Sequence, residues 1–418
     1  MIKKKSKIKV LVAMSGGVDS SVVAAVLVRA GYDVTGMFAV NFDEQKSNGE
    51  SCWHGDYQDA LRVTAKLGIP LLRWDFKKEY RRDVLDYMYR EYSVGRTPNP
   101  DVLCNKFIKF GAWLDRARQH GFDFIATGHY ARLRSGNSKF KIPNYKEITN
   151  CKLQLLNAKD DNKDQTYFLH QLNQDQLSHT MFPIGEYTKP EVRKLAKKFD
   201  LPTAEKEESM GICFVGEVSM RDFLKREIKP VPGDVVLSDD TKVGEHEGLA
   251  FHTIGERIAV PHNCHSRGSG NPVANRLDPR FHGDDSAKPF FVVDKNFKKN
   301  QLIVGHEDDR LLYKFEISVS ELNWVSGQPP KFPLKCKVRL RHRQPLQDCV
   351  VCHPEPCLPC LPDRQAAGRR SPFDCAQGKL RESKDLSVKF TTPQRAVTSG
   401  QFAVFYKNNY CLGGGVIK

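Results

Sequence analysis

The glycine-rich segment at residues 15–21 constrains the fold of this chain more than any other feature. It reads Ser-Gly-Gly-Val-Asp-Ser-Ser, follows the apolar residues 8–13 and leads directly into the apolar residues 22–27. Paired glycines allow positive φ angles and a close approach of the backbone to an anion, and a following helix start offers unpaired N–H groups and a positive dipole end. The order of strand, loop and helix therefore predicts a phosphate-binding loop.

The details of this loop separate it from two common phosphate-binding motifs. A Walker loop ends in Gly-Lys-Ser/Thr and a dinucleotide-binding loop carries Gly-x-Gly-x-x-Gly, and the segment has neither. It resembles the PP-loop of the ATP pyrophosphatases, Ser-Gly-Gly-x-Asp-Ser. In that family the loop binds the β,γ-pyrophosphate of ATP as a leaving group while AMP is transferred to a carbonyl oxygen. The alternative is a glycine turn between a strand and a helix that binds no ligand.

Alternating apolar patterns predict an α/β fold for the first part of the chain. We expect strands at residues 32–40, 69–76 and 122–130, and helices at residues 56–68, 77–94 and 106–120. Such alternation predicts a doubly wound parallel sheet whose ligand lies outside the carboxyl ends of the strands. The glycine-rich segment and residues 127–129 both fall at such ends.

Composition limits the class of partner. The chain has 418 residues, and 65 Lys and Arg against 50 Asp and Glu give a formal net charge of +15. This balance favours a polyanionic partner such as RNA, although a basic solvated face would give the same total. The N-terminal lysines do not precede a signal-peptide pattern, and no apolar run is long enough to span a membrane, so we expect a cytoplasmic chain with free thiols.

Two cysteines stand in loops that suit reactive groups. Cys104 ends a proline-rich segment, and we expect Asn105 to cap a helix beginning at residue 106, so that the helix N-terminus would favour the Cys104 thiolate. Cys213 lies between glycines at residues 211 and 216. The alternatives are an inert packing residue for Cys104 and a small buried hydrophobe for Cys213.

The motifs together resemble a known family in order along nearly the whole chain. They lie at residues 15–20, 95–105, 126–130, 162–169, 211–214 and 411–415. This set is similar to the tRNA-specific 2-thiouridylases of the bacterial and mitochondrial type. The resemblance implies that ATP adenylates the C2 oxygen of uridine 34 at the tRNA wobble position, after which sulfur replaces that oxygen and AMP leaves.

The resemblance also implies roles for individual residues. Cys104 would be the attacking nucleophile, Cys213 would receive persulfide sulfur, and Asp101 would act as acid or base near the target base. The residues implied to bind ATP are Ala13, Met14, Ser15, Gly16, Gly17, Val18, Asp19, Ser20, Ala39 and Gly128. The residues implied to contact tRNA are Asn99, Pro100, Asp101, His129, Lys163, Asp164, Gln165, Arg341, His342 and Gln401. At His342 this sequence departs from the family, which usually has a tyrosine at that position.

The same resemblance implies ATP with loosely bound Mg²⁺, tRNA, a protein persulfide donor and a monomeric enzyme. We expect a PP-loop catalytic domain at residues 1–178, a central helical tRNA-binding region at 179–232 and a C-terminal β-barrel at 233–418. Disordered insertions are expected at residues 263–288 and 352–385, which lack periodicity. The cysteines at 349, 352, 357 and 360 form two Cys-x-x-Cys pairs, a pattern that is also found in metal sites. The two pairs are too close together in the sequence for such a site, so no metal is expected.

Two other functions fit parts of this pattern. One is a different PP-loop enzyme, such as an amidating ligase or a 4-thiouridine enzyme. An amidating ligase would need an ammonia source and no persulfide cysteine. The other is a tRNA-binding protein that has lost catalysis through its insertions.

Overall fold

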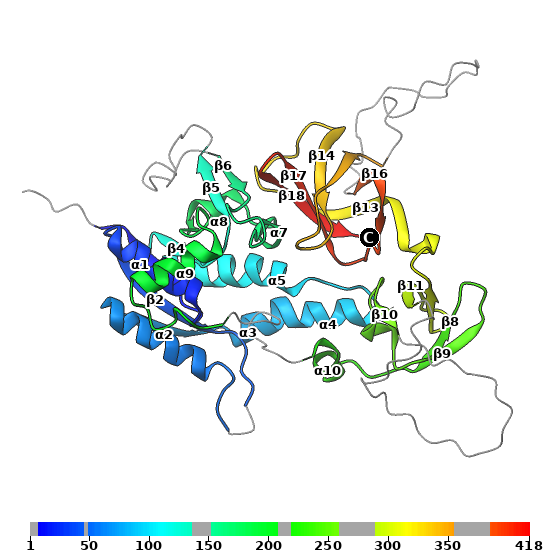
Figure 1. The fold of residues 1–418 in the computed structure, drawn as a ribbon, viewed down its shortest axis with the longest axis horizontal. Coiled ribbons are helices and arrows are strands. Elements are labelled where there is room, and N and C mark those ends of the chain that lie inside the picture. The colour runs from blue at the N-terminus through cyan, green and yellow to red at the C-terminus, as the bar shows by residue number, and fades with distance from the viewer. Residues whose placement is uncertain (1–6, 46–48, 136–151, 208–218, 259–288, 355–384) are drawn as a thin grey trace, which may run out of the picture.

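The structure is a computed structural model that describes residues 7–45, 49–135, 152–207, 219–258, 289–354 and 385–418. Figure 1 shows an α/β part at one end, a barrel at the other and a smaller sheet beside the barrel. None of the described helices is long and apolar enough to cross a membrane. Cys213 and most residues of the two expected insertions lie outside the described residues.

The α/β part is built on a parallel sheet with the strand order β3-β2-β1-β4-β7. Its strands are β1 (Lys9–Ala13), β2 (Asp33–Val40), β3 (Leu71–Asp75), β4 (Phe124–Ala126) and β7 (Thr180–Met181). The chain runs from β1 outward to β3 and then returns to β4 on the other side of β1. This reversal confirms the predicted doubly wound fold and leaves a crevice at the carboxyl ends of β1 and β4.

Helical segments connect these strands. They are α1 (Val18–Arg29), α2 (His54–Leu67), α3 (Lys77–Tyr80), η1 (Arg81–Leu85), α4 (Asp86–Ser93), α5 (Pro100–Leu103), η2 (Cys104–Ala112), α6 (Trp113–Gln119), α7 (Thr166–Leu169) and α8 (Gln174–Ser178). The helix predicted at residues 77–94 is observed with the π-helical turn η1 in its middle.

The helix predicted to begin at residue 106 begins six residues earlier, at Pro100. The Asn99 side chain accepts a hydrogen bond from the Val102 N–H (3.3 Å), and Pro100 occupies the first helical position, where its missing N–H costs nothing. Asn105 is buried inside the helical segment and does not cap it, so that prediction was wrong.

The central part contains two helices and a mixed sheet. Thr188 and Glu191 form a capping box at the start of α9 (Lys189–Lys198), and Ser219 caps α10 (Met220–Lys225). The sheet has the order β10-β11-β12-β8-β9. Its elements are β8 (Gly233–Val236), β9 (Lys242–His246), η4 (Leu249–Phe251), β10 (Arg257–Ile258), β11 (Phe290–Asn296) and β12 (Gln301–Gly305).

The C-terminal part is a closed antiparallel barrel. Its elements are η5 (Arg310–Leu312), β13 (Tyr313–Trp324), β14 (Leu334–Arg339), β15 (Gln347–Cys352), β16 (Leu386–Arg395), β17 (Phe402–Lys407) and β18 (Tyr410–Ile417). The order β13-β16-β15-β14-β17-β18 closes because β18 also pairs with β13. A hairpin from the first part, β5 (Arg132–Ser135) and β6 (Leu153–Leu156), adds to β18.

Two details differ from the expected organisation after residue 233. The region holds two separate sheets, since the central sheet and the barrel have their own apolar cores. Cys352, the expected first residue of an insertion, is buried as the last residue of β15, where Cys349 also lies. The ladder from β15 to β16 pairs Cys352 with Ser387, so the described barrel reaches into the expected insertion.

Candidate active site

The glycine-rich segment closes the carboxyl end of β1 and begins α1. Gly16 has a φ of +75°, and a Cβ atom there would lie 2.4 Å from the Asp56 carbonyl oxygen, so only glycine fits. Ser20 Oγ accepts a hydrogen bond from the Ser15 N–H (3.2 Å) and donates to the Gly17 carbonyl (3.1 Å). No side chain caps the N-terminus of α1 among the described residues, so its first N–H groups suit an anionic ligand.

Asp19, in the first turn of α1, is tied to two other segments. Its carboxylate accepts hydrogen bonds from the Tyr130 hydroxyl (2.9 Å) and from Lys189 Nζ (2.8 Å to each oxygen). The ion pair with Lys189 offsets a negative charge that would otherwise repel a phosphate at this loop. The sequence analysis did not identify Lys189. A positively charged lysine in the first turn of a helix interacts unfavourably with the helix dipole, which could have indicated an acidic partner elsewhere in the chain.

The loop after β4 lies against the same turn of α1. Gly128 lies next to Asp19 and Ser20, as expected for two loops at one crevice. His129 is buried, and burial together with nearby Lys109 holds the pKa of its imidazole well below the ordinary value. His129 is therefore neutral at pH 7, with its Nδ1 2.8 Å from Thr127 Oγ1. Ala39 is buried near the end of β2, two strands from β4 in the sheet.

Cys104 lies one helical turn beyond the N-terminus of α5 and is fully buried. Burial raises the pKa of its thiol to about 12, Lys109 opposes this rise in part, and Asp101 adds to it. The prediction that the helix N-terminus favours a thiolate was wrong for this structure, because the backbone N–H of Cys104 is bonded within the helix and water does not reach the sulfur.

This burial predicts slow alkylation of Cys104. A thiol with a pKa of about 12 is only about one ten-thousandth ionised at pH 8. We expect iodoacetamide to modify Cys104 of the free protein much more slowly than half-buried Cys52, at a rate that still rises from pH 8 to pH 10. Peptide mass spectrometry measures both rates. A Cys104 rate that levels off below pH 9 would contradict the burial.

Asp101 lies on the same short helix as Cys104 and has an unused acceptor. Its Oδ1 is buried and has no hydrogen-bond partner within the described part of the chain. A buried acceptor of this kind calls for a ligand group or water. Asn99 and Pro100, half-buried, form the start of that helix.

Within residues 163–165, Asp164 and Gln165 bind other parts of the protein through their side chains. The Asp164 carboxylate is buried and forms an ion pair with Arg339 (3.0 Å), while Gln165 Oε1 accepts a hydrogen bond from the Tyr130 N–H (2.9 Å). Lys163 is half-buried in the preceding turn. Of these three residues, Asp164 is therefore the least accessible to an RNA.

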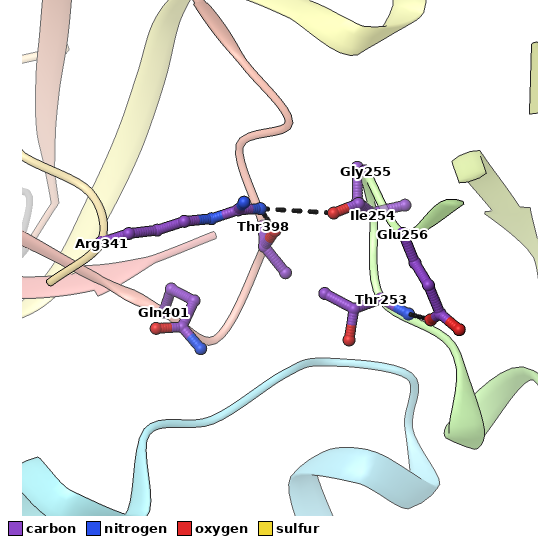
Figure 2. A pocket seen from close by; sticks show the side chains of 7 residues that line it. All are labelled: Thr253, Ile254, Gly255, Glu256, Arg341, Thr398 and Gln401. Atoms are coloured by element: carbon purple, nitrogen blue, oxygen red, sulfur yellow. Dashed lines mark hydrogen bonds between the residues drawn. The ribbon is translucent and has the colours of Figure 1, made fainter. Parts of the chain in front are cut away.

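Arg341 and Gln401 line a pocket of about 400 Å³ between the barrel and the central sheet, whereas neighbouring His342 packs against protein (Figure 2). The pocket is lined by Thr253, Ile254, Gly255, Glu256, Arg341, Thr398 and Gln401. The Arg341 guanidinium donates to the carbonyl groups of Ala396 (2.7 Å) and Ile254 (3.3 Å). The His342 ring lies 4.5 Å from that of Phe168, centroid to centroid.

The site residues thus form two groups. The phosphate loop, Asp19 and Gly128 meet at the crevice between β1 and β4, whereas Asp101 and Cys104 lie on the segment that packs against α7. Cys213 cannot be placed with either group, because it lies outside the described residues. No three His, Cys, Asp or Glu side chains in the described ranges gather as a metal site.

Family comparisons match the three structural parts. A tRNA methyl transferase HUP domain matches residues 8–217, a tRNA methyl transferase PRC-barrel domain matches residues 221–306, and an aminomethyltransferase beta-barrel domain matches residues 314–356 and 367–417. The second and third matches follow the central sheet and the barrel, whereas the first covers the α/β part and extends over α9 as well.

Similar relatives cover nearly the whole chain. A protein of Geobacillus thermodenitrificans, named tRNA-specific 2-thiouridylase MnmA, is 40% identical over 100% of this chain and 96% of its own. Proteins of the same name from Pseudoalteromonas translucida and Proteus mirabilis are 40% and 41% identical, each over 99% of this chain and 98% of their own.

Proposed function

Since this chain belongs to the family of tRNA-specific 2-thiouridylases, which are tRNA sulfurtransferases, we propose that it performs ATP-dependent 2-thiolation of uridine 34 in tRNA. The observation that carries this proposal is the open N-terminus of α1 at the crevice between β1 and β4, with Asp19 held by Lys189. This arrangement suits a pyrophosphate leaving group next to a parallel sheet.

The first step is adenylation of the tRNA base. The C2 oxygen of uridine 34 attacks the α-phosphorus of ATP, the bond to the β-phosphate oxygen breaks, and pyrophosphate leaves at the phosphate loop. The N–H groups of α1 bind the leaving pyrophosphate, the Ser20 hydroxyl holds the loop in shape through its bond to the Gly17 carbonyl, and Lys189 compensates for Asp19. The described residues offer no carboxylate cluster for Mg²⁺, so we propose that any Mg²⁺ arrives bound to the phosphates of ATP.

The second step transfers sulfur. The terminal sulfur of a Cys213 persulfide bonds to C2, and AMP leaves with the original oxygen. Cys104 attacks the Sγ of Cys213, so the sulfur–sulfur bond of the persulfide breaks and a Cys104–Cys213 disulfide forms. The sulfane sulfur is reduced while two thiols are oxidised, and an external thiol then reduces the disulfide. Asp101, with its free buried Oδ1, accepts or donates the proton at the base.

The proposed partners follow from this chemistry. They are tRNA, for which the net charge of +15 is favourable, and a protein persulfide that supplies sulfur to Cys213. We propose a monomeric enzyme that acts in the cytoplasm, where tRNA is its substrate.

The direct test is thiolation of unmodified tRNA by the purified protein with ATP and a protein persulfide. We expect 2-thiouridine at position 34 by nucleoside mass spectrometry, together with AMP and pyrophosphate in equal amounts. Release of ADP and phosphate would contradict adenylation, and incorporation of ammonia instead of sulfur would indicate an amidating ligase. Tight tRNA binding with neither product would indicate a protein that has lost catalysis.

A further inference from the structure

Residues 95–98, called here the strap, connect α4 to the helix that carries Asp101 and Cys104. The strap continues directly into Asn99, which caps that helix. In Figure 1 this connection runs from the end of α4 back to α5, beneath the barrel. Any displacement of the strap therefore moves the start of the segment on which Asp101 and Cys104 lie.

The barrel holds the strap through the loop before β17. The Thr97 N–H donates to the Ser399 carbonyl (2.9 Å), and Gln401 Nε2 donates to the carbonyl groups of Thr97 (3.0 Å) and Pro98 (3.4 Å). Figure 2 shows the Gln401 amide directed toward the pale blue ribbon of this connection. Both N–H groups of the amide are thus used on the strap.

The central sheet holds the strap from another side. Lys295 Nζ, on β11, donates to the Gly95 carbonyl (3.1 Å), and Thr253 Oγ1 lies 3.3 Å from Thr97 Oγ1. Gly95 has a φ of +77°, and a Cβ atom there would lie 1.7 Å from the ring of Phe297, so the strap and the sheet fit closely. Lys295 makes this contact although its burial is unfavourable and lowers the pKa of its amine to about 8.

We propose that Gln401 and Lys295 are positioning residues for thiolation, which hold the strap from two different sheets and so fix the place of Asp101 and Cys104. This inference rests on the proposed function and differs from the family resemblance, which implied that Gln401 contacts tRNA. An RNA phosphate needs a donor, and the amide donors of Gln401 already bind protein carbonyl groups.

The test uses Gln401→Met, which keeps the length of the side chain and removes its donors. We expect kcat at saturating tRNA to fall by about tenfold or more, because small misplacement of reacting groups is costly. The Kd for tRNA should change by less than about twofold, since no phosphate charge contact is lost. Amide hydrogen exchange in peptides spanning residues 95–104 should become about fivefold faster, as the loss of one or two hydrogen bonds implies.

Two further variants keep the test decisive. Lys295→Met removes the contact between the central sheet and the strap. It should lower kcat, leave the Kd for tRNA nearly unchanged and speed exchange at residues 95–104, and it provides the test even if Gln401→Met folds poorly. Gln347→Met is the matched control, because the amide of Gln347 bonds to Pro345 within the barrel. A weakened Kd for tRNA with unchanged kcat and unchanged exchange would overturn the proposal. Hydrogen exchange needs no turnover, so a wild-type protein without thiolation activity would refute only the proposed function.

Discussion

Asp19→Ala and Ser20→Ala are each expected to reduce tRNA-dependent release of AMP and pyrophosphate by about a hundredfold or more, because each change disturbs the preorganised loop at which the charge of the leaving group develops. Asp19→Ala removes the carboxylate that binds both Tyr130 and Lys189. Ser20→Ala removes the hydroxyl that closes the phosphate loop. Pyrophosphate release with unmodified tRNA, measured at saturating ATP, gives the rate.

Matched controls separate this effect from a general loss of stability. Asp33→Ala removes an exposed carboxylate at the start of β2, and Ser178→Ala removes a hydroxyl that bonds to the Asp175 carbonyl and the neighbouring His179 ring at the end of α8. Both should keep nearly wild-type rates. If Asp19→Ala kept its rate of pyrophosphate release while the controls behaved normally, the leaving group would lie elsewhere.

Local patterns were sufficient to predict the doubly wound sheet. The strands around β1 and β2 are short apolar runs bounded by helices, and the right-handed connection between parallel strands leaves few possible orders. The barrel was harder to predict, because its closure depends on pairing between β13 and β18, about ninety residues apart in the chain. For the same reason the sequence did not separate the central sheet from the barrel, and it did not indicate that β6 joins β18.

The site shows the same division between local and distant contacts. The phosphate loop depends on neighbouring residues, and its geometry agrees with the motif. Lys189 reaches Asp19 from 170 residues away, and no local pattern names that partner. The Cys104 prediction failed because burial raises the pKa of the thiol more than the helix N-terminus lowers it. The burial comes from segments distant in the sequence. One of them is α7, where the Phe168 carbonyl accepts a hydrogen bond from the side chain of Asn105, the residue after Cys104.

Cys104→Ser is expected to lower 2-thiouridine formation by about a thousandfold or more, the scale seen when a catalytic nucleophile is removed. The variant should still release pyrophosphate and still carry labelled persulfide sulfur, because neither step uses Cys104. Cys213→Ser should release pyrophosphate but take up no labelled sulfur from a protein persulfide. Trapping of the labelled sulfur and nucleoside analysis distinguish the two failures.

The burial of Cys104 makes a stability control necessary. A serine there places a hydroxyl in an apolar site at a cost of about 1–3 kcal/mol. Cys352→Ser introduces the same group at a buried position of β15, so it should show a similar loss of stability with thiolation retained. The sulfur donor must be a protein persulfide, since free sulfide can react without Cys213. Substantial 2-thiouridine from Cys104→Ser would refute the proposed role of Cys104, and equal labelling of both cysteine variants would refute that of Cys213.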